Sequence, residues 1–312
     1  MSSRNNYIIF ESIGETSKDI MGTAVVSAIH KTYPDMPIVV SSLHPEVWMH
    51  NPDVYRVYNP NNTQYFYDDF IASGTSKIFK LDPYHTNDFL FNNVHIIEAW
   101  CKLCGVPYKG EQPRLYFTAR EKQVPEKLLR GSLAKESESR TVERPIFLIQ
   151  IHGEGDGMPY PTGWSRNVEQ SVAQEVVNQM IEKGYRVLQI LPPNTQLLTG
   201  AEQIVFDNKL LMAALPLSSK RLFIDSFPQH AAAALGLPSV VLWNTLDETR
   251  HGYSLHRNIR AKETPKMAEL RQKVVEQFRL VNILPQHTIP TIDDVKDFFK
   301  ASEIVKALNK TG

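Results

Sequence analysis

Polar side chains gather where an apolar run meets an alanine-rich helix, in the segment 221–245, RLFIDSFPQHAAAALGLPSVVLWNT. The first apolar run reaches an Asp-Ser pair, and a glycine and a proline end the following helix before a second apolar run. The side chains that could do chemistry here are Asp225, Ser226, Gln229, His230, Asn244 and Thr245. In a parallel α/β sheet, the carboxyl ends of strands and the amino ends of the following helices line the ligand crevice. Because helix amino ends favour anions, the segment predicts a phosphate-binding site.

The same residue types also have structural uses. Asp and Ser are good helix N-caps, so a capping role is the alternative for Asp225 and Ser226. A histidine in the first turn of a buried helix could be a core residue, which is the alternative for His230. The glycine-rich loop after residue 151 lacks the spacing of a P-loop or of an ordinary dinucleotide site.

Along the chain, short apolar runs typical of strands alternate with segments that have helical spacing. This alternation predicts two α/β halves, and the segment 221–245 belongs to the second. The first half predicts strands at 7–10, 37–40, 55–58 and 77–81, helices at 19–33 and 92–103, short helices near 45–49 and 65–72, and an edge strand at 115–117. The second half predicts strands at 146–151 and 186–191 and a helix that carries the stripe Val168, Val172, Val176 and Met180. We therefore expect an amino-terminal domain (1–130), a linker (131–144), a carboxy-terminal domain (145–290) and a helical tail (291–312).

Composition excludes several classes of protein. The 34 basic residues balance the 34 acidic ones, which argues against a general polyanion binder. No apolar run approaches the roughly 18 to 20 residues of a membrane span, and no secretory signal is evident, so we expect a cytoplasmic protein. Cys101 and Cys104 lack a second pair for zinc, and the favoured interpretation is two buried thiols on one helix face. Metal-ligand spacing of histidines and acids is absent, and no metal is predicted.

At this point the residues resemble a known family, the ADP-heptose:lipopolysaccharide heptosyltransferases of glycosyltransferase family nine. The segment from Asp225 to Pro238 resembles the family signature Asp-Ser/Thr-Gly-x-x-His-x-x-x-Ala-x-Gly-x-Pro. Further landmarks follow in the family's order, including Ile13-Gly14, Tyr33-Pro34-Asp35, Asn51-Pro52, Gly105-Val-Pro107 and Gly163-Trp164. The resemblance implies a GT-B fold, with two facing Rossmann-like domains of parallel sheets and a C-terminal helix that packs back across the domains.

The resemblance also implies a division of labour. The carboxy-terminal domain would hold a nucleotide-sugar donor, with His152 and Trp164 added to the donor side, and the amino-terminal domain would receive the acceptor. Helix N–H groups and hydroxyls would stabilise the leaving diphosphate in place of a metal cation. An acceptor hydroxyl needs a base to remove its proton.

Three positions depart from the family pattern. The family's proposed base, an aspartate four residues after the glycine that matches Gly14, is replaced by Lys18. Asp19 and Glu15 are the nearest carboxylates, and we predict that one of them is the base, with Asp19 preferred. An N-terminal helix position is the structural alternative for Asp19. Thr162 and Phe227 replace a basic residue and a glycine, and one hypothesis is that Lys18 supplies the missing positive charge.

These features together predict an inverting, metal-independent glycosyltransferase that needs no cofactor and moves a sugar, plausibly a heptose, from a nucleoside diphosphate to an acceptor hydroxyl. The acceptor would be a lipopolysaccharide core or another glycan, with transient membrane-surface contact and a hydroxylated DNA base as further options. The rival functions are a catalytically silent nucleotide-sugar-binding protein and a sugar-nucleotide epimerase.

Overall fold

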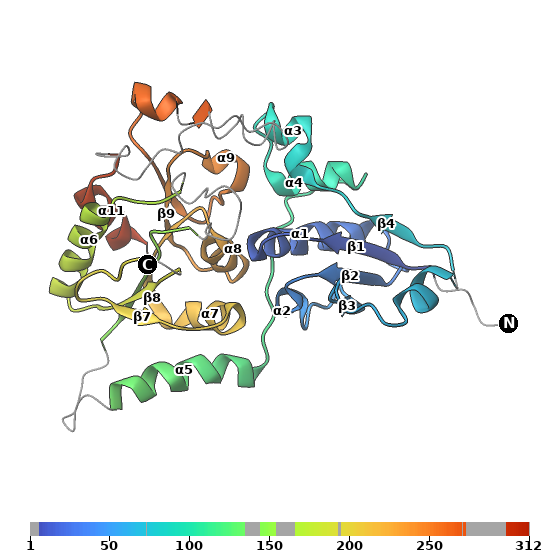
Figure 1. The fold of residues 1–312 in the computed structure, drawn as a ribbon, viewed down its shortest axis with the longest axis horizontal. Coiled ribbons are helices and arrows are strands. Elements are labelled where there is room, and N and C mark those ends of the chain that lie inside the picture. The colour runs from blue at the N-terminus through green and yellow to red at the C-terminus, as the bar shows by residue number, and fades with distance from the viewer. Residues whose placement is uncertain are drawn as a thin grey trace. The chain divides into compact units, whose positions relative to one another are not determined.

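A computed structural model describes residues 6–72, 74–134, 144–153, 166–192, 195–269, 271–272 and 298–311. The chain divides into two compact units, residues 1–120 and 121–312, each built on its own parallel sheet (Figure 1). The predicted alternation of strands and helices is therefore confirmed. The division between the units falls after Arg120 rather than at residue 130. Most of α5 (Ala119–Ala134) therefore belongs to the second unit, where the Arg186 side chain donates to the Leu129 carbonyl at 3.1 Å.

The first unit has a four-stranded parallel sheet in the order β3-β2-β1-β4. Its strands are β1 (Ile8–Ser12), β2 (Ile38–Ser42), β3 (Arg56–Tyr58) and β4 (Lys77–Phe79). Its helices are α1 (Thr16–Thr32), α2 (Pro45–Trp48), α3 (Asn87–Leu90) and α4 (Ile96–Leu103), with a π-helix at Tyr67–Ala72 and a 3-10 turn at Pro83–His85. β2 and β4 pair with opposite edges of β1. After β3, the chain therefore crosses to the other side of β1 to form β4.

Large aromatic side chains fill the space beneath α1. The Phe10 ring lies 6.0 Å from Trp48 and 5.2 Å from Trp100, measured between centroids, and all three are buried. Gly22 of α1 faces both indoles, and an added Cβ would come within 3.1 Å of Trp48. The glycine therefore lets α1 approach the sheet closely.

The second unit has a six-stranded parallel sheet in the order β10-β9-β8-β5-β6-β7. Its strands are β5 (Ile146–Ile149), β6 (Arg186–Ile190), β7 (Glu202–Ile204), β8 (Ser218–Ile224), β9 (Val240–Trp243) and β10 (Arg257–Arg260). Besides α5, its helices are α6 (Gln170–Glu182), α7 (Asn208–Ala214), α8 (Phe227–Ala234), α9 (Glu248–His251) and α11 (Ala301–Lys310). One core joins the sheet to α6 and α11, with Ile149, Met180 and Leu308 fully buried within it.

Several sequence-based boundaries differ from the structure. The segment 115–117 is not an edge strand, because the backbone just before it is tied to α1 by an Arg114 N–H hydrogen bond to Thr23 Oγ1 (3.0 Å). The strands β7 and β10 and the helix α5 were not predicted. The predicted linker is helical up to Ala134, and residues 135–143 lie outside the described part of the chain. The predicted tail helix is α11, which packs on the second unit; its reach to the first unit stays a prediction.

Candidate functional site

The carboxyl edge of the second sheet brings together most of the predicted donor residues. The central strand β5 is flanked by β6 on one side and β8 on the other, so the chain changes direction between β5 and β8. Ligands of open α/β sheets bind at this kind of switch point. Gln150 follows β5, Ser226 caps α8, and the Ser226 hydroxyl donates a 2.6 Å hydrogen bond to Gln150 Oε1. Ser226 thus bridges the switch point rather than capping α8 through its side chain.

Asp225 is a buried carboxylate between two histidines. His251 Nδ1 lies 3.4 Å from Asp225 Oδ2, and His230 Nε2 lies 3.8 Å from Oδ1. Burial alone would raise the pKa of Asp225, but His251, His230 and Arg166 outweigh it and hold the pKa at about 2. The carboxylate is therefore ionised throughout the neutral range.

A network of buried side chains surrounds His230. His230 Nδ1 lies 2.9 Å from the Tyr253 hydroxyl, and the Gln229 amide donates to the His251 carbonyl (3.2 Å). The His256 ring nitrogen Nε2 contacts the Gln229 carbonyl at 2.9 Å, and burial lowers the pKa of His256 to about 4. Sequence reasoning missed His251, Tyr253 and His256. Their only signal was the run His251-Gly-Tyr253-Ser-Leu-His256 just before a strand that was itself not predicted.

Two amide oxygens at this edge are buried without a donor among the described residues: Gln229 Oε1 and Asn244 Oδ1. The Asn244 amide group donates to the Asn167 carbonyl at 2.6 Å, and Asn167 Oδ1 accepts from the Gly153 N–H at 2.9 Å. Buried polar atoms are nearly always paired, so these two oxygens are candidates for contact with a hydrogen-bond donor that the described residues do not supply.

The other predicted donor residues have mixed outcomes. His152 is buried on this edge, and burial lowers its pKa. Thr245 is buried next to Asn244. Trp164 lies outside the described residues. Arg166, which the sequence reasoning missed, donates to the Asp225 carbonyl at 3.3 Å and adds positive charge to this edge.

In the first unit, Gly14 and Lys18 lie where β1 joins α1. Lys18 is buried, and its ammonium donates to the Ile13 carbonyl (3.1 Å) and lies 3.5 Å from Asp82 Oδ2. It also stands over the rings of Tyr84 and Trp100 at 5.9 and 5.6 Å. These contacts occupy the charge of Lys18 within its own unit. That Lys18 binds a phosphate stays a prediction. It requires the Lys18 ammonium to give up these contacts for contacts with the phosphate.

Asp19 is fully buried in the first turn of α1, with no exposed surface. The Ser42 hydroxyl donates a 2.6 Å hydrogen bond to Asp19 Oδ2. Burial raises the pKa of Asp19 to about 6, against the opposing effects of the Ser12 and Ser42 hydroxyls and of His44. Glu15, by contrast, is exposed at the N-cap of α1. The basicity of Asp19 suits a general base, but its burial separates it from any acceptor.

A histidine that sequence reasoning missed lies beside Asp19, two residues after β2. His44 Nε2 lies 3.1 Å from the Gly14 carbonyl, and Nδ1 lies 3.3 Å from Thr16 Oγ1 and 3.6 Å from Glu46 Oε1. Hydrogen bonding to Glu46 raises the pKa of His44, against the effect of burial. The available signal was its place four residues after the predicted strand 37–40, in a region where parallel α/β sheets carry functional residues.

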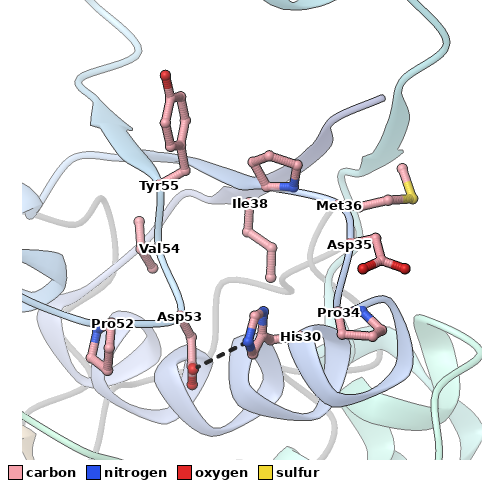
Figure 2. A pocket seen from close by; sticks show the side chains of 10 residues that line it. His30, Pro34, Asp35, Met36, Ile38, Pro52, Asp53, Val54 and Tyr55 are labelled. Atoms are coloured by element: carbon pink, nitrogen blue, oxygen red, sulfur yellow. Dashed lines mark ion pairs between the residues drawn. The ribbon is translucent and has the colours of Figure 1, made fainter. Parts of the chain in front are cut away.

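A separate hollow lies at the opposite, amino edge of the first sheet (Figure 2). It encloses about 360 Å³ between the end of α1 and the segments 34–38 and 52–55. Its polar wall includes His30 and Asp53, whose Nε2 and Oδ1 lie 4.0 Å apart. None of the predicted site residues lines it, so it is distinct from the carboxyl-edge clusters.

Among the described residues, no group of three or more histidine, cysteine or acidic side chains is arranged to hold a metal ion. Cys101 and Cys104 are free, buried thiols, and burial raises the pKa of each to about 12. This confirms the prediction of two packed thiols on a helix. No helix in the described part of the chain is long and apolar enough to cross a membrane.

Comparison with solved structures finds the same fold in proteins of low sequence identity. A glycosyltransferase family 9 protein from Veillonella parvula DSM 2008 matches with a TM-score of 0.66 at 12% identity, over 98% of this chain and 97% of that chain. ADP-heptose lipopolysaccharide heptosyltransferase II of E. coli matches with a TM-score of 0.59 at 14% identity, over 88% and 98%. TibC, a dodecameric iron-containing glycosyltransferase of enterotoxigenic E. coli, matches with a TM-score of 0.64 at 13% identity, over 99% and 76%.

Neither a protein-family model nor a curated protein sequence matches the chain. The structural likeness extends over nearly the whole chain, so it covers both parallel-sheet units. The fold is therefore the GT-B fold of the family 9 glycosyltransferases, as the sequence resemblance indicated.

Proposed function

We propose that this chain transfers a sugar from a nucleoside diphosphate to an acceptor hydroxyl. The observation that carries the proposal is the carboxyl edge of the second sheet, where Ser226 bridges the switch point. Beside it, Gln229 and Asn244 each present a buried oxygen that lacks a donor among the described residues. The fold of the family 9 glycosyltransferases supports the same activity.

The chemistry of this edge suits a diphosphate leaving group. The amino end of α8 carries partial positive charge, although Pro228 has no N–H and the Gln229 N–H donates to the Ser226 carbonyl (3.2 Å). The imidazoles of His230 and His251 and the guanidinium of Arg166 surround the ionised Asp225. Groups fixed in this way stabilise charge that develops on a phosphate oxygen as the glycosidic bond breaks.

The finer features of the reaction are also proposals. ADP-heptose is the first donor to test, because one solved structure of TibC contains ADP-D-β-D-heptose. We propose inversion at the anomeric carbon, a glycan acceptor and transfer without a metal, although TibC is described as iron-containing. Activity that survives exhaustive treatment with EDTA would support the absence of a metal.

Donor binding can be tested by changing one buried amide. In Asn244→Asp, a carboxylate of the same size repels a diphosphate, and we expect nucleoside diphosphate to bind at least tenfold more weakly. The matched control is Asn178→Asp on the exposed face of α6, whose new carboxylate can still accept from Gln174. Thermal-shift titrations measure both, since a ligand of the folded state raises stability by RT ln(1 + [L]/Kd). Equal affinities in the two variants would contradict the placement of the donor.

A second function, a catalytically silent nucleotide-sugar-binding protein, is favoured by two observations: Asp19 is fully buried, and Lys18 is paired with Asp82. It predicts donor binding without turnover. Incubation with labelled ADP-heptose and truncated lipopolysaccharide, followed by measurement of released ADP, separates the two functions.

A further inference from the structure

We propose that His44, and neither Asp19 nor Glu15, takes the proton from the acceptor hydroxyl, with Glu46 stabilising the imidazolium that forms. This inference rests on the proposed glycosyl transfer. His44 lies at the carboxyl edge of the first sheet, just beyond β2 and next to the beginning of α1. In a parallel α/β sheet this is the edge that substrates approach.

The predicted base Asp19 does not reach solvent. Its side chain has no exposed surface, and Oδ2 is engaged by the Ser42 hydroxyl at 2.6 Å. A general base must come within hydrogen-bond distance of the proton that it removes. The side chains of His44 and Glu46 are 26% and 25% exposed, so solvent reaches this pair, whereas it does not reach Asp19.

The contacts of His44 fix which ring nitrogen is basic. A carbonyl oxygen can only accept, so the 3.1 Å contact between Nε2 and the Gly14 carbonyl places the ring proton on Nε2. Nδ1 then carries the lone pair. The Thr16 hydroxyl lies 3.3 Å from Nδ1, so an acceptor hydroxyl must displace this contact before Nδ1 takes its proton.

Glu46 is placed to stabilise the charged product of that step. Its Oε1 lies 3.6 Å from Nδ1, the atom that receives the proton. Hydrogen bonding to Glu46 raises the pKa of His44. In the catalytic triad of serine hydrolases the carboxylate binds the ring nitrogen opposite the basic one. Here Glu46 lies beside the nitrogen that receives the proton, so it would stabilise the new N–H and its charge directly.

Asp19 then acts as a positioning residue. The Ser42 hydroxyl donates a hydrogen bond to Asp19 Oδ2 and accepts one from the backbone N–H of His44 at 2.9 Å. The buried carboxylate therefore fixes the turn that carries His44. Its negative charge also raises the pKa of His44.

The step balances without a further reactant. The acceptor O–H bond breaks as the acceptor oxygen bonds to the anomeric carbon, and the proton passes to Nδ1 of His44. The bond from the anomeric carbon to the diphosphate oxygen breaks, and its electron pair leaves with the nucleoside diphosphate. The imidazolium later returns the proton to water.

Glu15 is the competing base. It is exposed, and among the described residues its side chain accepts a 3.4 Å hydrogen bond from Ser17 Oγ. Nothing among its described contacts orients its carboxylate toward the position that the Thr16 hydroxyl marks. His44, by contrast, is held at both ring nitrogens.

The test compares steady-state transfer by the full-length variants His44→Gln and Glu46→Gln. Glutamine can still donate to the Gly14 carbonyl, so we expect His44→Gln to fold and to lower kcat by roughly 10² to 10⁴-fold, the usual contribution of a general base. Glu46→Gln should lower kcat by about tenfold and move the acidic limb of the kcat–pH profile to lower pH, because the pKa of His44 falls. The matched control is His30→Gln, which removes an imidazole in the separate hollow of the same unit. Its kcat should equal that of the wild type.

Three outcomes overturn the inference. An unchanged kcat in His44→Gln would show that another group is the base while transfer itself stands. Loss of transfer in Glu15→Gln together with retention in His44→Gln would assign the role to Glu15. If ADP-heptose and the common nucleoside diphosphate sugars fail to raise the melting temperature of the wild type, the proposed function fails, and this inference fails with it.

Discussion

The buried carboxylate of Asp225 should contribute measurable stability to the second unit. Its pKa is about 2 in the folded chain against an ordinary value of 3.8. A carboxylate with a lowered folded pKa stabilises the native state above its unfolded pKa, and this contribution is lost as pH falls through the folded pKa. At 1.36 kcal/mol per pKa unit, Asp225→Asn should cost about 2 kcal/mol at pH 6 and about 1 kcal/mol at pH 3.

Urea unfolding monitored by far-UV circular dichroism tests this expectation. With an m-value of about 2 kcal/mol/M, the midpoint of the transition of the second unit should fall by about 1 M at pH 6. Comparing the variant with the wild type at each pH cancels the titration of groups common to both. The matched control is Asp207→Asn, an exposed N-cap of α7 that accepts from the Leu210 N–H, because asparagine caps as well as aspartate. A difference that stays constant from pH 6 to pH 3 would refute the assignment of the stability to the ionised carboxylate.

Three further outcomes follow from the structure. Gly14→Ala should destabilise the first unit by about 2 kcal/mol, because Gly14 has a φ of +150° and its added Cβ would meet Lys18 Cδ at 3.0 Å; urea unfolding measures it. Cys101 and Cys104 should not react with a thiol reagent until urea unfolds the first unit, since burial raises both pKa values to about 12; fast labelling of the folded chain would contradict this. His256 has a folded pKa of about 4 against 6.5, so the wild type should lose about 3 kcal/mol of stability as pH falls from 6.5 to 4, and His256→Gln should lack that loss when both are unfolded in urea across this range.

The sequence by itself determined the features that depend on local pattern. Apolar runs, helical spacing and the Gly236-Leu-Pro238 stop were enough to place β8, α8 and β9, and thereby Asp225 and Ser226 at the carboxyl end of a strand. The two buried cysteines also followed from one helix face. Short or polar elements such as β7 and β10 gave no such signal, because their stability comes from pairing with a neighbouring strand rather than from their own residues.

Only the tertiary structure decided which side chains meet. The order of strands brings Gln150 from β5 to Ser226, and β2 beside β1 brings Ser42 and His44 to Asp19 and Gly14. These partners are separated by many residues, and their pairing depends on strand order, which periodicity does not encode. The same order buries Asp19, the carboxylate that the sequence favoured as the base. Residue type can therefore indicate the chemistry available to this chain, but burial and orientation decide which group an acceptor can reach.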